Sequence, residues 1–78
     1  MMNMHDMFID LTGLESPVPV IRTKEALDDM QVGQVLKVTT TIESSAKNIR
    51  TLVANNPYEI IHFSRKKEEY TFMIRKNG

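Results

Sequence analysis

The segment that most constrains the fold of this chain is residues 13–20, with the sequence GLESPVPV. A strand-like run over Met7–Leu11 precedes this segment, and an amphipathic helical run follows it. Pro17 suits the first position of a helix, because its fixed φ fits there and its missing N–H is not needed. Pro19 still falls within the first turn, and Ser16 is the expected N-cap. The segment therefore predicts a strand, a short loop and a helix that begins directly after Ser16.

The remaining sequence continues to alternate between strand-like and helix-like patterns, and β-branched residues are frequent in the strand-like segments. The predicted elements are a strand over Met7–Leu11, a helix over Pro17–Met30, a strand over Val35–Thr41, a helix capped by Ser44 or Ser45 and stopped at Asn55-Asn56-Pro57, a strand over Tyr58–Ser64, a turn over Lys66–Glu68 and a strand over Glu69–Lys76. Right-handed crossovers place both helices on one face of the sheet. We predict the fold class α/β, a two-layer α/β sandwich in the order β-α-β-α-β-β with a four-stranded sheet. At 78 residues the chain is expected to form a single domain, residues 1–78.

Apolar periodicity indicates which faces are buried. In the first helix, Leu27 and Met30 continue a stripe from Val20, with Thr23 or Lys24 between them, and Ile21 is expected to widen it. In the later elements, the predicted inward-facing residues are Leu36, Val38, Thr40, Ala46, Ile49, Leu52, Val53, Tyr70 and Phe72.

Residues 13–20 resemble the signature of the TusA/SirA-like family of small sulfur-carrier proteins, Gly-Leu-x-Cys-Pro-x-Pro-Val. The matching residues are Gly13, Leu14, Pro17, Pro19 and Val20, followed by Thr23-Lys24-x-Ala26-Leu27 and Gly33. The resemblance implies a mixed sheet and a role in relaying persulfide sulfur between proteins, for example toward tRNA thiolation. It implies protein partners: a desulfurase or rhodanese-like donor and an acceptor protein. The motif and docking residues would be Gly13, Leu14, Glu15, Pro17, Pro19 and Lys24.

The sulfur-carrying cysteine of the family is replaced by Ser16 in this chain. A thiol there would be activated, because the positive end of the helix stabilises a thiolate. A serine hydroxyl stays protonated at neutral pH, and its oxygen does not carry a transferable sulfane sulfur. We therefore expect Ser16 not to be competent for carrier chemistry. Three interpretations of Ser16 remain: a helix cap, a substitution of the family's cysteine, or a natural member that does not use the carrier step.

A serine nucleophile would need an adjacent base and an oriented third group. The two histidines, His5 and His62, have no spacing that places either beside the helix start. We therefore expect the protein not to be a classical enzyme.

Three further departures from the family follow the second strand. The family often has Thr-Asp-Pro, Asp-Ile and Gly-His where this chain has Thr41-Ile42-Glu43, Asn48-Ile49 and Asn56-Pro57. These positions in the family are expected to shape the site or help partner docking.

An alternative function is an RNA-binding or regulatory module that uses the open sheet face and a basic hairpin. Residues 34–78 contain eight basic and four acidic residues, a net charge of +4. If the last two strands pair closely, five basic residues would gather at one end of the hairpin: Arg65, Lys66, Lys67, Arg75 and Lys76. Aromatic residues nearby could then stack on bases.

The sequence contains no cysteine, which excludes disulfides and thiolate metal sites. No metal site or cofactor is predicted, because the histidines lack paired ligand spacing. No apolar run approaches the roughly 18 residues that a transmembrane helix needs. Residues 1–6 lack the basic and apolar regions of a secretory signal. We therefore expect a cytoplasmic protein with no membrane partner that is a monomer.

Overall fold

The computed structural model describes residues 5–78, so residues 1–4 of the segment assessed for a secretory signal lie outside the described residues. The elements are β1 (Met7–Asp10), α1 (Val18–Asp29), β2 (Val35–Thr40), α2 (Glu43–Ala54), β3 (Tyr58–Lys66) and β4 (Glu69–Lys76). This confirms the predicted order β-α-β-α-β-β. β3 extends two residues beyond the prediction, because Arg65 and Lys66 still pair with Tyr70 and Glu69 of β4.

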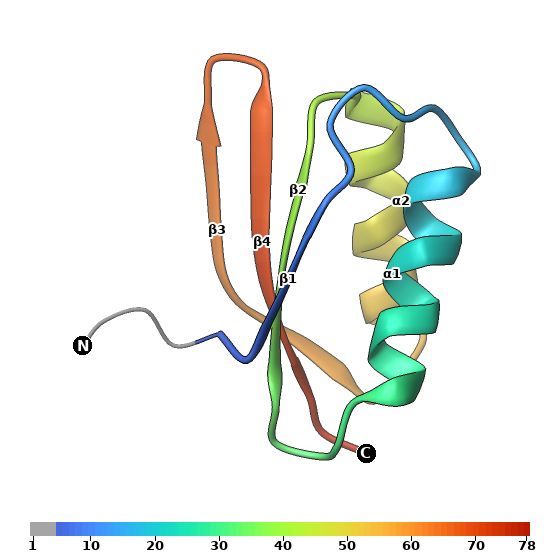
Figure 1. Cartoon of the computed structure of the whole chain (residues 1–78), viewed down its shortest axis with the longest axis vertical. Helices are drawn as coiled ribbons and strands as arrows, with labels where there is room; N and C mark the ends of the chain where they lie inside the picture. Colours follow the sequence, from blue (N-terminus) through green and yellow to red (C-terminus); the bar gives the residue numbers. More distant parts are fainter. Residues whose placement is uncertain (1–4) are drawn as a thin grey trace.

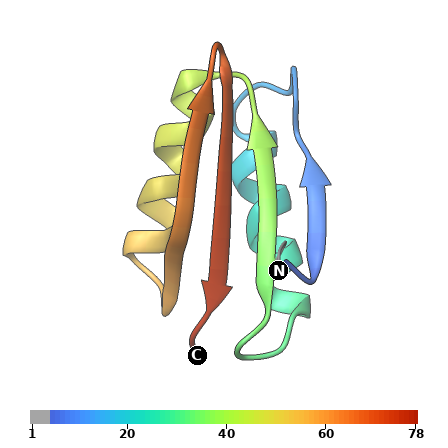
Figure 2. The same cartoon turned by 90° about the vertical axis from the view of Figure 1, so that its left-hand side faces the viewer.

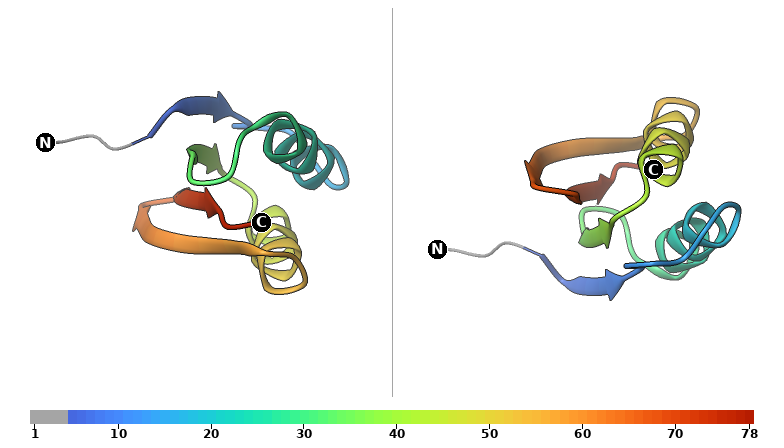
Figure 3. Two further views of the ribbon diagram at one scale, coloured as in Figure 1. Left: turned by 90° about the horizontal axis from the view of Figure 1, so that it is seen from below. Right: turned by 90° about the horizontal axis from the view of Figure 1, so that it is seen from above.

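The four strands form a mixed sheet in the order β1-β2-β4-β3. β1 pairs with β2 in parallel, and the other neighbours are antiparallel. Figures 1 and 2 show both helices on one side of the sheet, which leaves the other face uncovered. The two end-on views in Figure 3 separate the layer of strands from the layer of helices. The two-layer α/β sandwich predicted from the sequence is thus confirmed.

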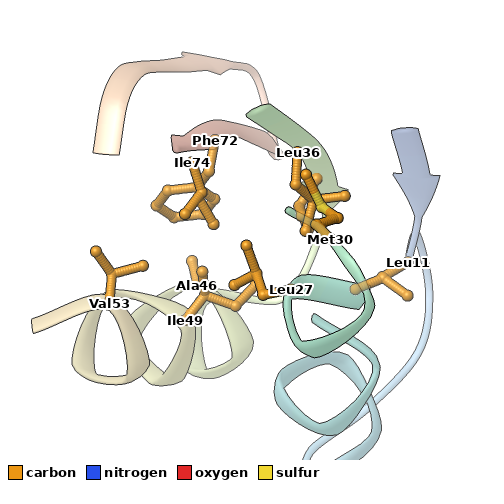
Figure 4. Packing of buried hydrophobic residues seen from close by; sticks show 10 residues of the cluster. Leu11, Leu27, Met30, Leu36, Ala46, Ile49, Val53, Phe72 and Ile74 are labelled. Carbon is orange, nitrogen blue, oxygen red and sulfur yellow. The ribbon is translucent and has the colours of Figure 1, made fainter. Parts of the chain in front are cut away.

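The core lies between the two layers, where residues from both helices meet the inner face of β2 and β4 (Figure 4). Phe72, Leu27 and Ile49 are each 0% exposed. The cluster consists of Leu11, Leu27, Met30, Leu36, Val38, Ala46, Ile49, Val53, Phe72 and Ile74. Removal of this apolar surface from water is the main force that stabilises the fold. The predicted inward-facing residues of β2 are confirmed, because Leu36, Val38 and Thr40 are all fully buried; Val35 and Thr39 are buried as well.

The buried face of α1 differs from the predicted stripe in one respect. Ile21 is 49% exposed, so the expectation that it widens the stripe was wrong. The buried residues within the helix are instead Pro19, Thr23 and Leu27, which follow one another at intervals of four. Thr23 is accommodated in this apolar position because its hydroxyl donates to the Pro19 carbonyl oxygen at 2.8 Å.

The predicted caps of α2 were also wrong. The helix begins at Glu43, Ile42 occupies the N-cap position, and no side chain caps it. The first helical bond runs from the amide of Ala46 to the carbonyl of Ile42, which places Ser44 and Ser45 inside the first turn. Ser45 is buried, and its Oγ has no hydrogen-bond partner within residues 5–78.

The C-terminal end of α1 is capped from a distant strand. Its last turn contains no basic residue and ends with Asp28-Asp29, which opposes the helix dipole. Lys76 of β4 compensates, because its Nζ donates to the carbonyl oxygens of Leu27 at 2.7 Å and Met30 at 2.8 Å. The backbone of Lys76 also pairs with Gly33 and Gln34 in the turn that follows α1. One residue therefore joins the end of α1 to the last strand.

The β3–β4 hairpin turns through Lys67 and Glu68, and Lys67 adopts a φ of +59°. Residues other than glycine are strained when φ is positive, because their Cβ atom is too close to the backbone. The turn therefore forms at some cost in stability.

None of the helices in the part of the chain that the structure describes is long and apolar enough to cross a membrane.

We expect Lys76→Met to lower the free energy of unfolding by about 1–2 kcal/mol, because it removes charge-assisted hydrogen bonds at the C-terminus of α1. Urea denaturation measures this change. The control is Lys66→Met at the exposed end of β3, which should change stability by less than about 0.5 kcal/mol. Equal effects of the two variants would contradict the capping role of Lys76.

We expect Lys67→Gly to raise the free energy of unfolding by about 0.5 kcal/mol, because relief of the positive φ exceeds the entropy cost of glycine. Glu68→Gly, at the neighbouring turn position without a positive φ, should give no gain. Thermal denaturation of both variants tests the comparison, and a gain at Glu68 alone would refute it.

Candidate functional site

The loop between β1 and α1 is held in place by hydrogen bonds at its start. Asp10 Oδ1 accepts bonds from the Thr12 amide at 3.0 Å and from the Thr12 hydroxyl. These bonds from Thr12 hold the pKa of Asp10 below its ordinary value. The Gly13 amide then donates to Thr41 Oγ1 at 3.0 Å, and Gly13 has a φ of +78°, which favours glycine. The loop is thus tied to the segment that joins β2 and α2.

Helix α1 begins one residue later than the sequence predicted. Its first residue is Val18, Pro17 occupies the N-cap position, and Pro19 lies in the first turn as predicted. The Val18 amide donates to the carbonyl oxygen of Glu15 at 3.0 Å. Ser16 therefore makes no side-chain cap, and the prediction that it caps the helix was wrong. The Ser16–Pro17 peptide bond is cis.

The exposed Ser16 side chain instead meets a residue from the second helix. Asn48 of α2 donates from Nδ2 to Ser16 Oγ at 3.3 Å, across 32 positions in the sequence. The sequence did not predict this contact, although it marked Asn48 as a departure from the family's Asp-Ile pair. The parallel pairing of β1 and β2 makes the contact possible, because both β–α junctions then lie at the same edge of the sheet.

The other motif residues divide into exposed and buried positions. Glu15 and Pro17 are exposed, and Leu14 is 39% exposed. Pro19 is fully buried in the first turn of α1, so its side chain presents no surface to a partner. Lys24 lies two helical turns beyond the loop, where it forms an exposed ion pair with Asp28 at 3.0 Å.

Exposed apolar side chains lie near Ser16 in the sequence, in the loop and on the first turns of α1. Val18 and Ile21 lie one turn apart on α1 and are 39% and 49% exposed, and Leu14 lies in the loop. We call Leu14, Val18 and Ile21 the apolar rim. Residues of this kind, exposed beside a fixed polar group, are typical of a surface that binds another protein.

The histidines lie away from this site. His5 precedes β1 and is therefore at the other end of that strand from Ser16. His62 lies on β3, the opposite edge of the sheet from β1. Within residues 5–78 no group of three His, Cys, Asp or Glu side chains could hold a metal ion.

The predicted basic cluster does not exist as one patch. Lys66 pairs with Glu69 beside the turn, whereas Arg75 and Lys76 pair with Glu59 and Tyr58 at the other end of the hairpin. Long antiparallel strands separate the two groups. Arg65, Lys66 and Lys67 stay at the turn end, but Arg75 Nη2 contacts Glu59 Oε1 at 2.6 Å and Lys76 caps α1. The RNA-binding alternative therefore lacks the surface on which it depended.

The β3–β4 turn lies on the same edge of the molecule as the β1–α1 loop (Figure 1). A shallow hollow of about 350 Å³ separates the turn from the β2–α2 junction, and it is lined by Thr41 and residues 66–69. Residues 66–69 are two lysines followed by two glutamates, so the hollow shows no dominant charge.

Comparison with known proteins identifies relatives that span almost the whole chain. The family described as "Sulfurtransferase TusA" matches residues 7–76. The sulfur carrier protein TusA of Allochromatium vinosum is 31% identical over 72 residues, which cover 92% of this chain and 95% of that protein. A protein of Methanocaldococcus jannaschii that is assigned as a sulfur carrier is 31% identical over 68 residues, or 87% of this chain and 91% of that protein.

A solved structure shares the fold. The crystal structure of a SirA-like protein from Desulfitobacterium hafniense superposes with a TM-score of 0.80 at 24% identity, and the match covers 92% of this chain and 99% of that one. The chain therefore belongs to the TusA/SirA-like family of sulfur carriers, whose function is sulfur relay.

Proposed function

We propose that this chain docks on the proteins of a sulfur relay through the surface around Ser16, and that with serine at this position it does not carry sulfur itself. Its partners in this proposal are a persulfide donor, such as a desulfurase or a rhodanese-like protein, and an acceptor protein. The observation that carries the proposal is the exposed position of Ser16 on a fixed loop at the start of α1.

The backbone around Ser16 supports docking without help from its side chain. Five bonds hold the loop: two from Thr12 to Asp10, and one each from Gly13 to Thr41, from Leu14 to Leu11 and from Val18 to Glu15. A loop that is already ordered loses little conformational freedom when a partner binds. The apolar rim supplies the contact area that a partner would cover.

The chemistry of residue 16 argues against carrier activity in this chain. A persulfide carrier needs a thiolate that attacks the outer sulfur of a donor persulfide, so that a new S–S bond forms while the donor's S–S bond breaks and a donor thiolate leaves. Within residues 5–78 the hydrogen-bond partner of the Ser16 hydroxyl is the Asn48 amide, which is not a base, and both histidines lie elsewhere in the fold. The Ser16 oxygen cannot take the place of sulfur in that exchange.

We expect the Ser16→Cys variant to accept one sulfur atom from a persulfide-loaded cysteine desulfurase, because the substituted position is exposed at the positive end of α1. Mass spectrometry of the intact protein reads the added sulfur. The unaltered chain should gain none.

The control is Ser64→Cys, which places a thiol at an exposed position on the edge strand β3. It should accept at least tenfold less sulfur in the same time, since it lacks the docking surface. A folded Ser16→Cys variant that gains no sulfur from desulfurase or rhodanese-like donors, or gains no more than Ser64→Cys, would refute the proposal.

We expect Val18→Asn to slow sulfur transfer to the Ser16→Cys variant by about tenfold, because burial of an unpaired amide at a partner interface costs more than about 1 kcal/mol. The substitution adds no charge beside position 16, and Val18 is exposed, so folding is retained. The matched control is Val32→Asn: Val32 is 66% exposed in the turn after α1, at the other end of that helix. Transfer rates that respond equally to both substitutions would argue against the apolar rim as the docking surface.

A further inference from the structure

Asn48 is the residue outside the motif that contacts the side chain at position 16. Its Nδ2 lies 3.3 Å from Ser16 Oγ, and it is half-buried on the first turns of α2. The junction before α2 is also tied to the loop, through the bond from the Gly13 amide to Thr41 Oγ1. Two contacts, seven residues apart, therefore fix this part of α2 against the loop. The Asn48 amide is held where it faces the group at position 16.

We propose that Asn48 is the positioning residue for the group at position 16, and that its amide makes this site favour an anionic group there, such as a thiolate or a persulfide anion. The inference rests on the proposed function, in which the unaltered chain carries no sulfur, so the anion is the thiolate or persulfide of the Ser16→Cys form. The chemical reason is that an amide N–H donates to an anion and stabilises it, whereas a carboxylate of the same shape would repel it.

Because the surrounding charges nearly balance, the identity of residue 48 determines whether the site favours an anion. The charged residues at the end of β1, in the loop and in the first five residues of α1 and α2 are all exposed: Asp10, Glu15, Arg22, Glu43 and Lys47. The other charged residues of the two helices lie further along them: Lys24, Glu25, Asp28, Asp29 and Arg50. The first turn of α1 contains no acidic residue. Three acids and two bases nearly balance, so neither sign dominates before residue 48 is counted. A neutral donor at residue 48 leaves the dipole of α1 as the local bias, and this bias favours an anion.

The test compares full-length chains that carry Ser16→Cys alone or together with Asn48→Asp. The thiolate is followed by its ultraviolet absorbance and by its rate of alkylation across pH. We expect Asn48→Asp to lower the thiolate fraction at neutral pH by about fivefold, which is the effect of one further negative charge about 4 Å from the thiolate in a solvated setting. Asn48→Ala, which removes the donor without adding a charge, should lower it by a smaller factor in the same direction.

The matched control is Asn55→Asp in the Ser16→Cys background, because it adds the same charge at the far end of α2. It should leave the pH profile unchanged. The inference is overturned if Asn48→Ala or Asn48→Asp leaves the profile unchanged, or if Asn48→Asp and Asn55→Asp shift it equally. Circular dichroism confirms folding, and Asn48→Ala decides the question should Asn48→Asp fail to fold.

These measurements need no partner protein. A failure of sulfur transfer to the Ser16→Cys variant would therefore refute the proposed docking function while leaving the pH profile intact. An unchanged pH profile would refute the role of Asn48 while leaving sulfur transfer intact.

Discussion

The parallel pairing of β1 with β2 is the constraint on which the site depends. Parallel neighbours end at the same edge of a sheet, so the loop that starts α1 and the junction that starts α2 must lie side by side. The bonds from Gly13 to Thr41 and from Asn48 to Ser16 follow from that proximity. An antiparallel pair would place the two junctions at opposite ends and separate these residues by the length of the strand.

The sequence predicted what depends on local pattern and missed what depends on details of geometry. The order of the elements and the burial of Leu36, Val38 and Phe72 follow from apolar periodicity, because the apolar face of each element packs into the core. The start of each helix was misplaced, because serines near a helix start are good caps in general, whereas here Pro17 and Ile42 occupy the N-cap positions and their carbonyls accept the first helical bonds. The basic residues of the hairpin appeared close because the register, with Lys66 beside the turn and Lys76 at the far end, was not known.

The candidate site was predicted in part for the same reason. Its loop could be found from residues 13–20, since prolines and glycine constrain the backbone through local sterics. The contact between Ser16 and Asn48 joins residues 32 positions apart, so no local pattern contains it. The sequence held one indirect signal, because the resemblance implied that Asn48 departs from an acid that the family often has. Only the topology shows that Asn48 lies beside Ser16.

The geometry of the loop reduces the number of interpretations of Ser16. A serine at a helix start is usually explained by its capping bond, which stabilises the helix by about 1 kcal/mol. Here the side chain makes no such bond, so the capping interpretation no longer accounts for the residue. The bonds that hold the loop run from Thr12 to Asp10, from the Gly13 amide to Thr41 and from the Val18 amide to the Glu15 carbonyl. None of these bonds involves the Ser16 side chain. The loop therefore keeps its shape whether residue 16 is serine or cysteine. Substitution of one for the other changes the chemistry of the site but not its backbone geometry.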